Sequence, residues 1–266
     1  MATLRKQIRL FFDGATLSYV ALFHWLHPLT YIASKILMPL AQMLFFVFLG
    51  SFATSSSNSS FYVIGNAIQI AAVSGIYGVV FSIGGDRNEG TLPYIFGSPA
   101  NRIVTFFGRA FMHVIDGAFG VVIGFFWGVT LLGLDLSHTN LAALGLTILV
   151  TTLSTCGLGL LMGCIGLITV NVMFVNNTVY FLLLLFSGAN IPLAQMPDWM
   201  LFISQALPLT RGIEAARALV AGASFETIVP LLLGELAVGL IYGLLGYFLF
   251  SWFEYQAKSI GTLETV

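Results

Sequence analysis

The sequence contains little charge: 8 % of its 266 residues are Asp, Glu, Lys or Arg, where a soluble domain has about 25 %. Ten Lys and Arg stand against eleven Asp and Glu, giving a net charge of −1 and no long basic run. This excludes a nucleic-acid footprint and a charged disordered tail. What remains is apolar, with 58 % hydrophobic residues and a mean hydropathy of +0.96, which indicates a membrane protein.

Cysteine is almost missing, and the two that occur do not predict a disulfide. Cys156 and Cys164 lie eight residues apart in one apolar stretch, which on a helix separates them by about 12 Å along the axis. A disulfide requires Cα atoms less than about 7 Å apart. We expect both thiols to be small packing groups.

The sequence also lacks the motifs of nucleotide and metal chemistry. A phosphate-binding loop needs Gly before a Lys that is followed by Ser or Thr, but the one such Lys, Lys258, follows Ala257. HExxH, paired CxxC and GxSxG patterns are missing too, so a metalloprotease, a zinc site and a hydrolase have no support. We expect no catalytic residue, no metal site and no cofactor bound by this chain.

Six apolar stretches have roughly the 20 residues that cross a bilayer as a helix. They cover residues 31–52, 61–83, 104–133, 141–168, 176–192 and 228–252. The sequence therefore predicts an all-α integral membrane protein with six transmembrane helices. The whole of 1–266 then forms one transmembrane domain, with an N-terminal region at 1–30 and a C-terminal tail at 253–266.

The positions of the cations predict the orientation, because cytoplasmic loops collect Lys and Arg. With the N-terminus inside, both termini are cytoplasmic and only Arg211 and Arg217 lie outside. The loop at 169–176 carries no charge and does not test this. The cations on or near the inner side are Arg5, Lys6, Arg9, Lys35, Arg87, Arg102, Arg109 and Lys258.

The N-terminal region has the pattern of an amphipathic helix. Leu4, Ile8 and Phe11 recur at helical spacing, while Arg5 and Lys6 fall on other faces. Such a helix lies in the membrane interface with its apolar face toward the acyl chains. We expect an interfacial helix at the inner surface.

Ionisable residues inside spans are costly and are candidates for function. Here they are Lys35, His113, Asp116 and Glu235. Arg109, His113 and Asp116 share one helix face, so they either pair with one another or handle protons or substrate. Glu235 requires a partner, for which Lys35 and Arg109 are the candidates.

Small and aromatic residues mark contact faces. Glycines at spacings of four suit close helix packing in lipid; they are Gly120, Gly124 and Gly128 in the third span, Gly159 and Gly163 in the fourth, and Gly239 and Gly243 in the sixth. The outer end of the first hairpin carries an aromatic cluster that faces lipid, a partner subunit or an apolar substrate. Its members are Phe45, Phe46, Phe48, Phe52 and Phe61.

The segment 84–102 between the second and third spans combines charges with an apolar patch. The patch comprises Leu92, Tyr94, Ile95 and Phe96, which a solvated loop does not expose without a reason. One interpretation is a short helix that docks on another protein. The alternative is a patch folded back onto the membrane surface.

This segment resembles the first cytoplasmic loop of the permease subunits of type-2 ABC exporters. Members carry an acidic residue, then Gly-Thr-Leu-Glu, a hydrophobic stretch and a Pro; here the order is Glu89-Gly90-Thr91-Leu92, with Pro93 in place of the acidic residue, ending at Pro99. The residues after the fifth span are similar to the family's external segment before its last helix. They are 187–192, 196–199 and 207–217.

The resemblance implies an exporter permease in the bacterial cytoplasmic (inner) membrane, moving a hydrophobic or amphipathic substrate such as a drug, antibiotic, lipid or lipid-linked glycan. It implies a second permease, identical or homologous, and two copies of a cytoplasmic ATPase that supplies ATP and Mg²⁺ binding. The implied ATPase-coupling residues are Asp86, Arg87, Glu89, Gly90, Thr91, Leu92, Tyr94, Phe96 and Pro99. The candidates for the substrate path or for intramembrane polar roles are Lys35, Phe45, Phe46, Arg109, His113, Asp116 and Glu235. A re-entrant external segment is expected around Pro192, Pro197, Pro208, Arg211, Glu214 and Arg217.

Two other functions stay open at this point. A stand-alone secondary transporter or channel would use His113, Asp116 and Glu235 as proton or ion sites, and a membrane-embedded enzyme is the third possibility. In the external segment, Arg211, Glu214 and Arg217 lie at three-residue spacings. They either form intrahelical ion pairs or take part in gating.

Overall fold

The computed structural model describes residues 2–25, 27–54, 59–88, 90–167 and 171–260. Within these ranges the chain is helical and has no strand. The prediction of an all-α protein is confirmed. Glu89, which the resemblance places in the coupling segment, lies outside the described residues.

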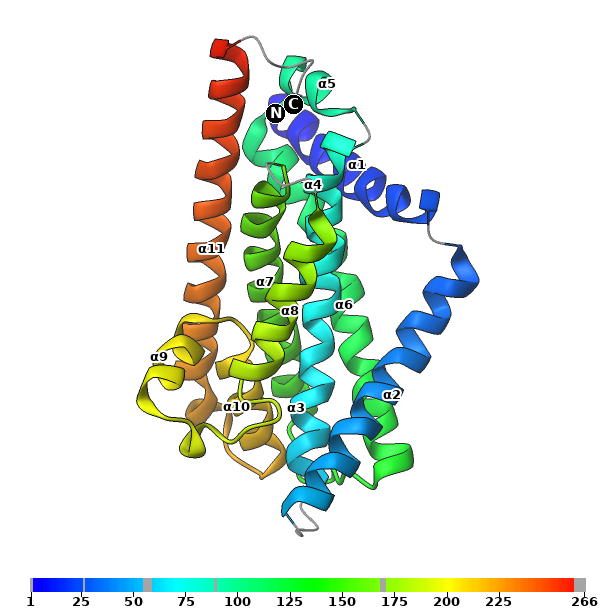
Figure 1. Cartoon of the computed structure of the whole chain (residues 1–266), viewed down its shortest axis with the longest axis vertical. Coiled ribbons are helices and arrows are strands. Elements are labelled where there is room, and N and C mark those ends of the chain that lie inside the picture. The colour runs from blue at the N-terminus through cyan, green and yellow to red at the C-terminus, as the bar shows by residue number, and fades with distance from the viewer. Residues whose placement is uncertain (1, 26, 55–58, 89, 168–170, 261–266) are drawn as a thin grey trace.

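Long helices run along the length of the molecule (Figure 1). They are α2 (Pro28–Thr54), α3 (Ser59–Ala72) with its continuation through the π-helical turn η1 (Val73–Gly78) into α4 (Val79–Asn88), α6 (Arg102–Leu132), α7 (Leu141–Gly166) and α11 (Phe225–Ile260). Five described stretches are long and apolar enough to cross a membrane: 28–52, 59–86, 102–132, 141–166 and 225–256. The protein is therefore a multi-pass membrane protein.

The expected span 176–192 differs from the others. Its helix, α8 (Val172–Phe186), has 15 residues and is about 22 Å long at 1.5 Å per residue. The chain then turns at Gly188, whose φ is 79°, and leads into the short helix η2 (Leu193–Gln195). By length alone α8 falls short of a full crossing. Helix length therefore supports five of the six predicted spans, and the span at 176–192 is the exception.

The short helices lie at the two ends of the bundle (Figure 1). At one end, α1 (Ala2–Trp25) crosses the bundle obliquely near α5 (Leu92–Gly97) and the last turns of α11. At the other end, α9 (Asp198–Ala206) and α10 (Thr210–Val220) connect α8 to α11. The bundle therefore has two distinct ends: one contains α1 and α5, and the other contains α9 and α10.

Local sequence signals explain where the long helices begin and end. Side-chain oxygens of Asn101 and Asn140 accept the backbone N–H of Val104 at 3.3 Å and of Ala143 at 3.1 Å, which caps the first turns of α6 and α7. Gly133 ends α6 in the left-handed conformation, with φ of 66°, where a side chain would be strained.

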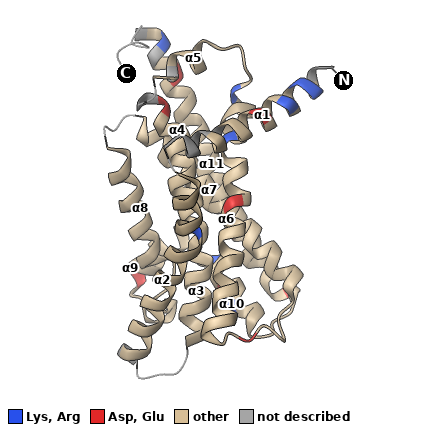
Figure 2. Ribbon diagram, turned by 90° about the vertical axis from the view of Figure 1, so that its right-hand side faces the viewer, with Lys and Arg blue, Asp and Glu red and all other residues tan. Residues whose placement is uncertain are grey.

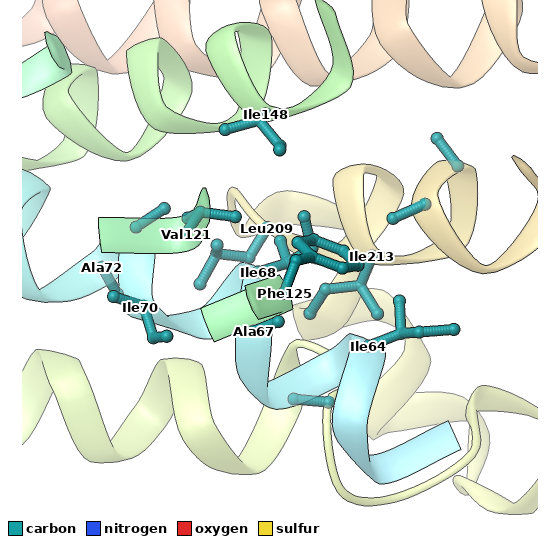
Figure 3. Close-up of a cluster of buried hydrophobic side chains, with 14 of the residues drawn as sticks. Ile64, Ala67, Ile68, Ile70, Ala72, Val121, Phe125, Ile148, Leu209 and Ile213 are labelled. Carbon is teal, nitrogen blue, oxygen red and sulfur yellow. The ribbon is translucent and has the colours of Figure 1, made fainter. Parts of the chain in front are cut away.

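The central helix is α3. In the most apolar part of the span that contains it, 72 % of the residues are buried, against 22 % for α2 and 28 % for α11. Its residues Ile64, Ala67 and Ile68 pack with Val121 and Phe125 of α6 (Figure 3). The exposed faces of α2 and α11 are thus the faces available to lipid or to partners.

Glycines bring the backbones of α7 and α11 together, as their spacing predicts. A Cβ added to Gly239 would lie 2.5 Å from the Cα of Ser154, and one on Gly157 would collide with the carbonyl oxygen of Gly239. Small residues permit this approach. Cys156 and Cys164 are both buried and unpaired on α7, which confirms them as packing groups.

Gly239→Ala is expected to lower the free energy of unfolding by about 1–3 kcal/mol, because the added methyl forces α7 and α11 apart. The matched control is Gly145→Ala on α7, where an added Cβ meets nothing within 4 Å and Ala favours the helix. Thermal unfolding of both variants in the same detergent measures the difference. An equal melting temperature for the two would contradict the close contact.

Candidate functional site

A closed polar triad joins three helices in the middle of the bundle. Lys35 of α2 donates to Asp116 of α6 at 2.5 Å and to Ser74 of η1 at 2.6 Å. Ser74 in turn donates to the same Asp116 oxygen at 2.6 Å. Lys35 is 9 % and Asp116 7 % exposed, so the charges neutralise one another away from solvent. We call Lys35, Ser74 and Asp116 the intramembrane triad.

A π-helical turn and two glycines of α6 leave space for the intramembrane triad between the helices. Ser74 lies in the π-helical turn, a form that frequently marks functional sites. A Cβ on Gly117 would lie 3.2 Å from Cβ of Ser74, and one on Gly120 would lie 3.9 Å from Nζ of Lys35. The glycines of α6 thus leave room for the polar side chains as well as for helix packing.

Two tyrosines connect the triad to α1. Tyr31 of α2 donates to the second oxygen of Asp116, and its hydroxyl lies 2.7 Å from that of Tyr19 on α1. Burial raises the pKa of Tyr19 above its usual range, so this phenol stays protonated at neutral pH. The oblique helix α1 is therefore tied to the interior of the bundle.

The proposed pairing of Arg109, His113 and Asp116 with one another is wrong. Arg109 binds the carboxylate of Asp86 and donates to the carbonyl of Ser82 at 2.8 Å. His113 is 1 % exposed, and neither ring nitrogen has a hydrogen-bond partner in the described part of the chain. Residues on one helix face can pair, but here Arg109 and Asp116 bind groups on neighbouring helices instead.

Glu235 pairs with neither Lys35 nor Arg109, which contradicts both suggested partners. One carboxylate oxygen accepts the backbone N–H of Leu209 at 2.7 Å, and the other has no partner among the described residues. Leu209 has a φ of 80°, a conformation that costs a non-glycine residue energy. By accepting this hydrogen bond, Glu235 stabilises the strained turn directly before α10. A carboxylate at this place also interacts favourably with the N-terminus of the helix.

Asp86 links α4 to the following turn. Its side chain accepts the hydroxyl of Thr91 at 2.8 Å, and its backbone carbonyl accepts the N–H of Thr91 at 2.9 Å. Gly90 forms the turn with φ of 66°. Asp86 thus faces Arg109 and Thr91 inside the protein. Arg87 is placed in the last turn of α4.

The helix α5 separates the apolar patch into an inner and an outer part. Phe96 is 4 % exposed and belongs to one buried cluster with Phe106 and Phe250. The Phe250 ring lies 5.6 Å from that of Phe96 and 5.1 Å from that of Phe106. Tyr94 is 79 % exposed, and Pro99 is exposed as well. Phe96 therefore anchors α5 on its own bundle, and Tyr94 is the outward-facing aromatic residue. The Leu92 position begins the helix.

Pro93 is compatible with the helix although it departs from the family pattern. It occupies the first turn of α5, which begins at Leu92. In the first turn a missing N–H breaks no intrahelical bond, and the fixed φ of proline suits the helix.

Arg102 fastens α5 to the end of α11, a connection that the sequence analysis missed. Its Nε lies 2.8 and 2.9 Å from the two oxygens of Glu254, and another nitrogen donates to the carbonyl of Phe96 at 3.0 Å. Lys258 also donates to Glu254 at 2.6 Å. The only signal in the sequence was the pair of opposite charges four residues apart in the tail.

At the opposite end, Arg217 of α10 binds three backbone carbonyls. It donates to Gly188 at 2.9 Å and to Phe61 and Ala189 at 3.0 Å each. The guanidinium carbon lies 3.6 Å from the centre of the Phe61 ring, a cation–π contact. We call this set of contacts the Arg217 clamp; it joins α10, the start of α3 and the turn after α8.

The intrahelical ion pairs expected for the external segment do not form. Within the described ranges, no ion pair closer than 4 Å involves Arg211, Glu214 or Arg217. Burial raises the pKa of Glu214, while the charges of Arg211 and Arg217 partly offset that rise. The prolines bound the short helices: Pro192 precedes η2, Pro197 precedes α9, and Pro208 lies between α9 and α10.

The sequence analysis also missed a chain of uncharged polar groups between α2, α3 and α8. The hydroxyl of Tyr180 donates to Gln42 at 2.5 Å, and Asn66 donates to Asn190 at 2.8 Å. Gln42 joins the two pairs through a long 3.4 Å hydrogen bond to Asn66. We call these four residues the amide ladder. Amide and phenol side chains within apolar spans are the signal in the sequence for such a chain.

Two further amide side chains, on the helices α8 and α3 that also carry the amide ladder, have polar atoms without a hydrogen-bond partner among the described residues. Asn176 of α8 is completely buried, and neither its oxygen nor its nitrogen has a partner in the described structure. The nitrogen of Gln69 on α3 is unpaired too, although its oxygen accepts the hydroxyl of Ser187 at 3.1 Å. Unpaired buried polar atoms are uncommon and indicate a place where other groups bind or where helices move.

The aromatic cluster divides between two places. Phe45 is 60 % exposed, and its ring lies 5.1 Å from that of Phe46 on α2. Phe48 and Phe52 are exposed on the same helix, whereas Phe61 lies under Arg217 at the start of α3. The α2 aromatics are therefore available to lipid, partner or substrate.

Helical spans that are joined by a buried ion pair and by uncharged polar groups define a multi-pass membrane protein. The family of ABC-2 type transporters matches residues 16–220. The chain belongs to this family, which confirms the resemblance, and it is a transmembrane permease component rather than the catalytic subunit. No curated protein matched the chain.

Proposed function

We propose that this chain is the permease of an exporter that moves a hydrophobic or amphipathic substrate out of the cell, driven by a separate cytoplasmic ATPase. The match of residues 16–220 to the ABC-2 family carries this proposal. ATP and Mg²⁺ are bound by two ATPase copies, and a second permease completes the transporter.

In this arrangement the chain crosses the bacterial cytoplasmic membrane six times, with the short helix α8 as the fifth crossing. The end with α1 and α5 faces the cytoplasm, as do both termini. The distribution of cations supports this orientation, because Lys and Arg gather on α1 and around α5 (Figure 2) and cations favour the cytoplasmic side. The segment with α9 and α10 re-enters from outside, where its irregular backbone packs against protein.

The substrate path runs along α2 and α8. The exposed faces of these helices carry Phe45 and Phe181, which are 60 and 64 % exposed, and the amide ladder lies between the helices. Aromatic surfaces with uncharged hydrogen-bonding groups suit an amphipathic cargo. The second permease packs along the same faces and closes the path.

The helix α5 transmits the ATPase motion. Tyr94 and Pro99 face outward with the turn at Gly90, while Phe96 and Arg102 fasten the helix to α6 and α11. A movement of the ATPase that displaces α5 therefore shifts the spans between two packings, which is the population change that transport requires. Glu89 lies next to this surface in the sequence.

Purification of the tagged protein from its native membrane in mild detergent is expected to recover an ATPase. Tyr94→Ala is expected to reduce the recovered ATPase about 5-fold or more, since an exposed aromatic anchor at an interface contributes over 1 kcal/mol. The matched control is Phe202→Ala, an 80 % exposed aromatic residue on α9 at the other end. Quantitative mass spectrometry of the copurified chains gives the ratio.

A chain that purifies without an ATPase would overturn the proposal and favour a stand-alone ion-coupled transporter. Equal recovery with Tyr94→Ala and Phe202→Ala would instead show that α5 is not the docking helix.

A further inference from the structure

A groove lies on the side of the bundle formed by α1, α6, α7 and α11, apart from the amide ladder. Its volume is about 450 Å³, and its walls include Phe11, Phe107, Val114, Leu160 and Gly243. This volume is in the range of small-molecule binding sites, about 300–1,000 Å³. None of the residues assigned above to coupling, to the substrate path or to the external segment lines it.

The groove is apolar and opens to the membrane. The hydroxyl of Ser154, the one polar side-chain group in its wall, donates to the carbonyl of Glu235 at 2.9 Å. Leu153, Leu240 and Leu244 at the groove are 45–56 % exposed. Water needs two to four polar partners to occupy a cavity, and it finds none here. In a bilayer, hydrocarbon fills such a space because an empty groove loses dispersion contacts.

The helix that closes one side of the groove also carries unpaired cations. Arg5 and Lys6 are exposed, and within the described residues neither takes part in an ion pair, whereas Arg9 is neutralised by Asp13 at 3.2 Å. Lys6 precedes Phe11 by five residues, which is about 7.5 Å along α1. Long Lys and Arg side chains reach toward headgroups while their stems stay in apolar surroundings. Figure 2 shows Lys and Arg along α1, the helix whose Phe11 lines the groove.

We propose that this groove binds one phospholipid, with an acyl chain between α6 and α11 and an anionic headgroup held by Arg5 and Lys6. Basic residues beside grooves between spans select anionic lipids over zwitterionic ones. The lipid fills the wall between α6 and α11 and fixes α1 against the bundle. This inference concerns the membrane face of the chain and rests on neither the ATPase nor the cargo.

The test measures the lipid retained by the full-length protein after reconstitution in nanodiscs of equal phosphatidylglycerol and phosphatidylcholine. Native mass spectrometry is expected to show one retained phospholipid per chain, with phosphatidylglycerol preferred about 5- to 30-fold, since each cation contributes about fivefold. Arg5→Gln with Lys6→Gln is expected to bring that preference close to 1. Arg9→Gln is the matched control, because Arg9 is already paired, and it should retain the preference.

The groove itself is tested by filling it. Gly243→Leu places a side chain beside Phe107 in the groove, where an added Cβ lies at 3.4 Å, an ordinary contact distance; it should abolish lipid retention. Gly145→Leu on α7, which faces open space, should retain it. Circular dichroism establishes that each variant is folded. If Gly243→Leu does not fold, Val114→Phe takes its place as the filling variant.

Three results would overturn the proposal: no retained lipid in the unmodified protein, an unchanged preference in the Arg5 and Lys6 variant, or equal retention by the groove-filled and control variants. None of them bears on ATPase recovery. Failure of the lipid site and failure of the proposed function are thus distinguishable.

Discussion

Asp116→Ala is expected to lower the free energy of unfolding by about 3–5 kcal/mol, because it leaves the ammonium group of Lys35 buried without a counter-charge. Lys35 donates to both Asp116 and Ser74, and after the substitution only the neutral hydroxyl remains. The matched control is Asp13→Ala, which breaks a pair whose side chains are 83 and 60 % exposed. Such surface pairs contribute at most about 1 kcal/mol.

Reversible unfolding in one detergent, followed by far-ultraviolet circular dichroism, compares the variants. The double variant Lys35→Met with Asp116→Leu removes both charges and is expected to recover most of the lost stability, since similar-sized apolar residues replace a buried pair at little cost. The coupling between the two single changes should be at least about 2 kcal/mol. A loss no greater than that of Asp13→Ala would mean that the pair is not buried in the membrane.

The same double variant separates the two interpretations of the intramembrane triad. If the triad only joins α2, η1 and α6, a stable Lys35→Met, Asp116→Leu protein should transport normally. If the charges bind protons or substrate during transport, the double variant should recover its stability but should not transport. Because stability and transport are measured on the same protein, misfolding cannot be mistaken for loss of function.

The sequence predicts the spans well because hydropathy is a local property. Five long apolar helices occur where five of the six predicted stretches lie. The remaining stretch, 176–192, extends past the end of α8 because Ser187 and Gly188 lie within an apolar run, and only the left-handed φ of Gly188 reveals the turn. Gly90 and Gly133 form turns of the same kind where polar neighbours already indicate a loop.

The partners of the buried charges are not predictable in the same way. Lys35 and Asp116 lie 81 residues apart, and Arg102 and Glu254 lie 152 apart; nothing in their local sequence selects these pairs. A local rule favoured Arg109, His113 and Asp116 because they share a face. The packing of α4 and η1 against α6 decides the outcome, since it places Asp86 and Ser74 nearer than the next turn of the same helix.

The resemblance to a family supplied what periodicity alone did not. It indicates α5 as a coupling helix, yet it does not distinguish the residue that anchors the helix from the residue that faces outward. Burial makes that distinction: Phe96 is 4 % and Tyr94 79 % exposed. The test of docking therefore rests on Tyr94.

Arg217→Leu is expected to lower the free energy of unfolding by about 3 kcal/mol or more and to loosen the end of the protein that contains α9 and α10. The change removes the donor for the carbonyls of Gly188, Ala189 and Phe61, and a hydrogen bond from a charged group contributes about 1.5–3 kcal/mol. Burial lowers the pKa of Arg217 to about 9, which still leaves the guanidinium protonated at pH 7. The clamp therefore acts as a cation under physiological conditions.

Arg217→Lys discriminates between charge and geometry. A lysine keeps the positive charge but cannot present the planar fork that serves several carbonyls at once, so we expect it to recover less than half of the loss. Hydrogen exchange should show faster exchange in α10 and at the start of α3, with α1 and α5 unchanged. Exchange that rises equally at both ends would contradict a local clamp, and full recovery by lysine would show that charge alone holds the segment. Because the clamp joins α10 to the first turn of α3, its loss should also let those two elements move independently.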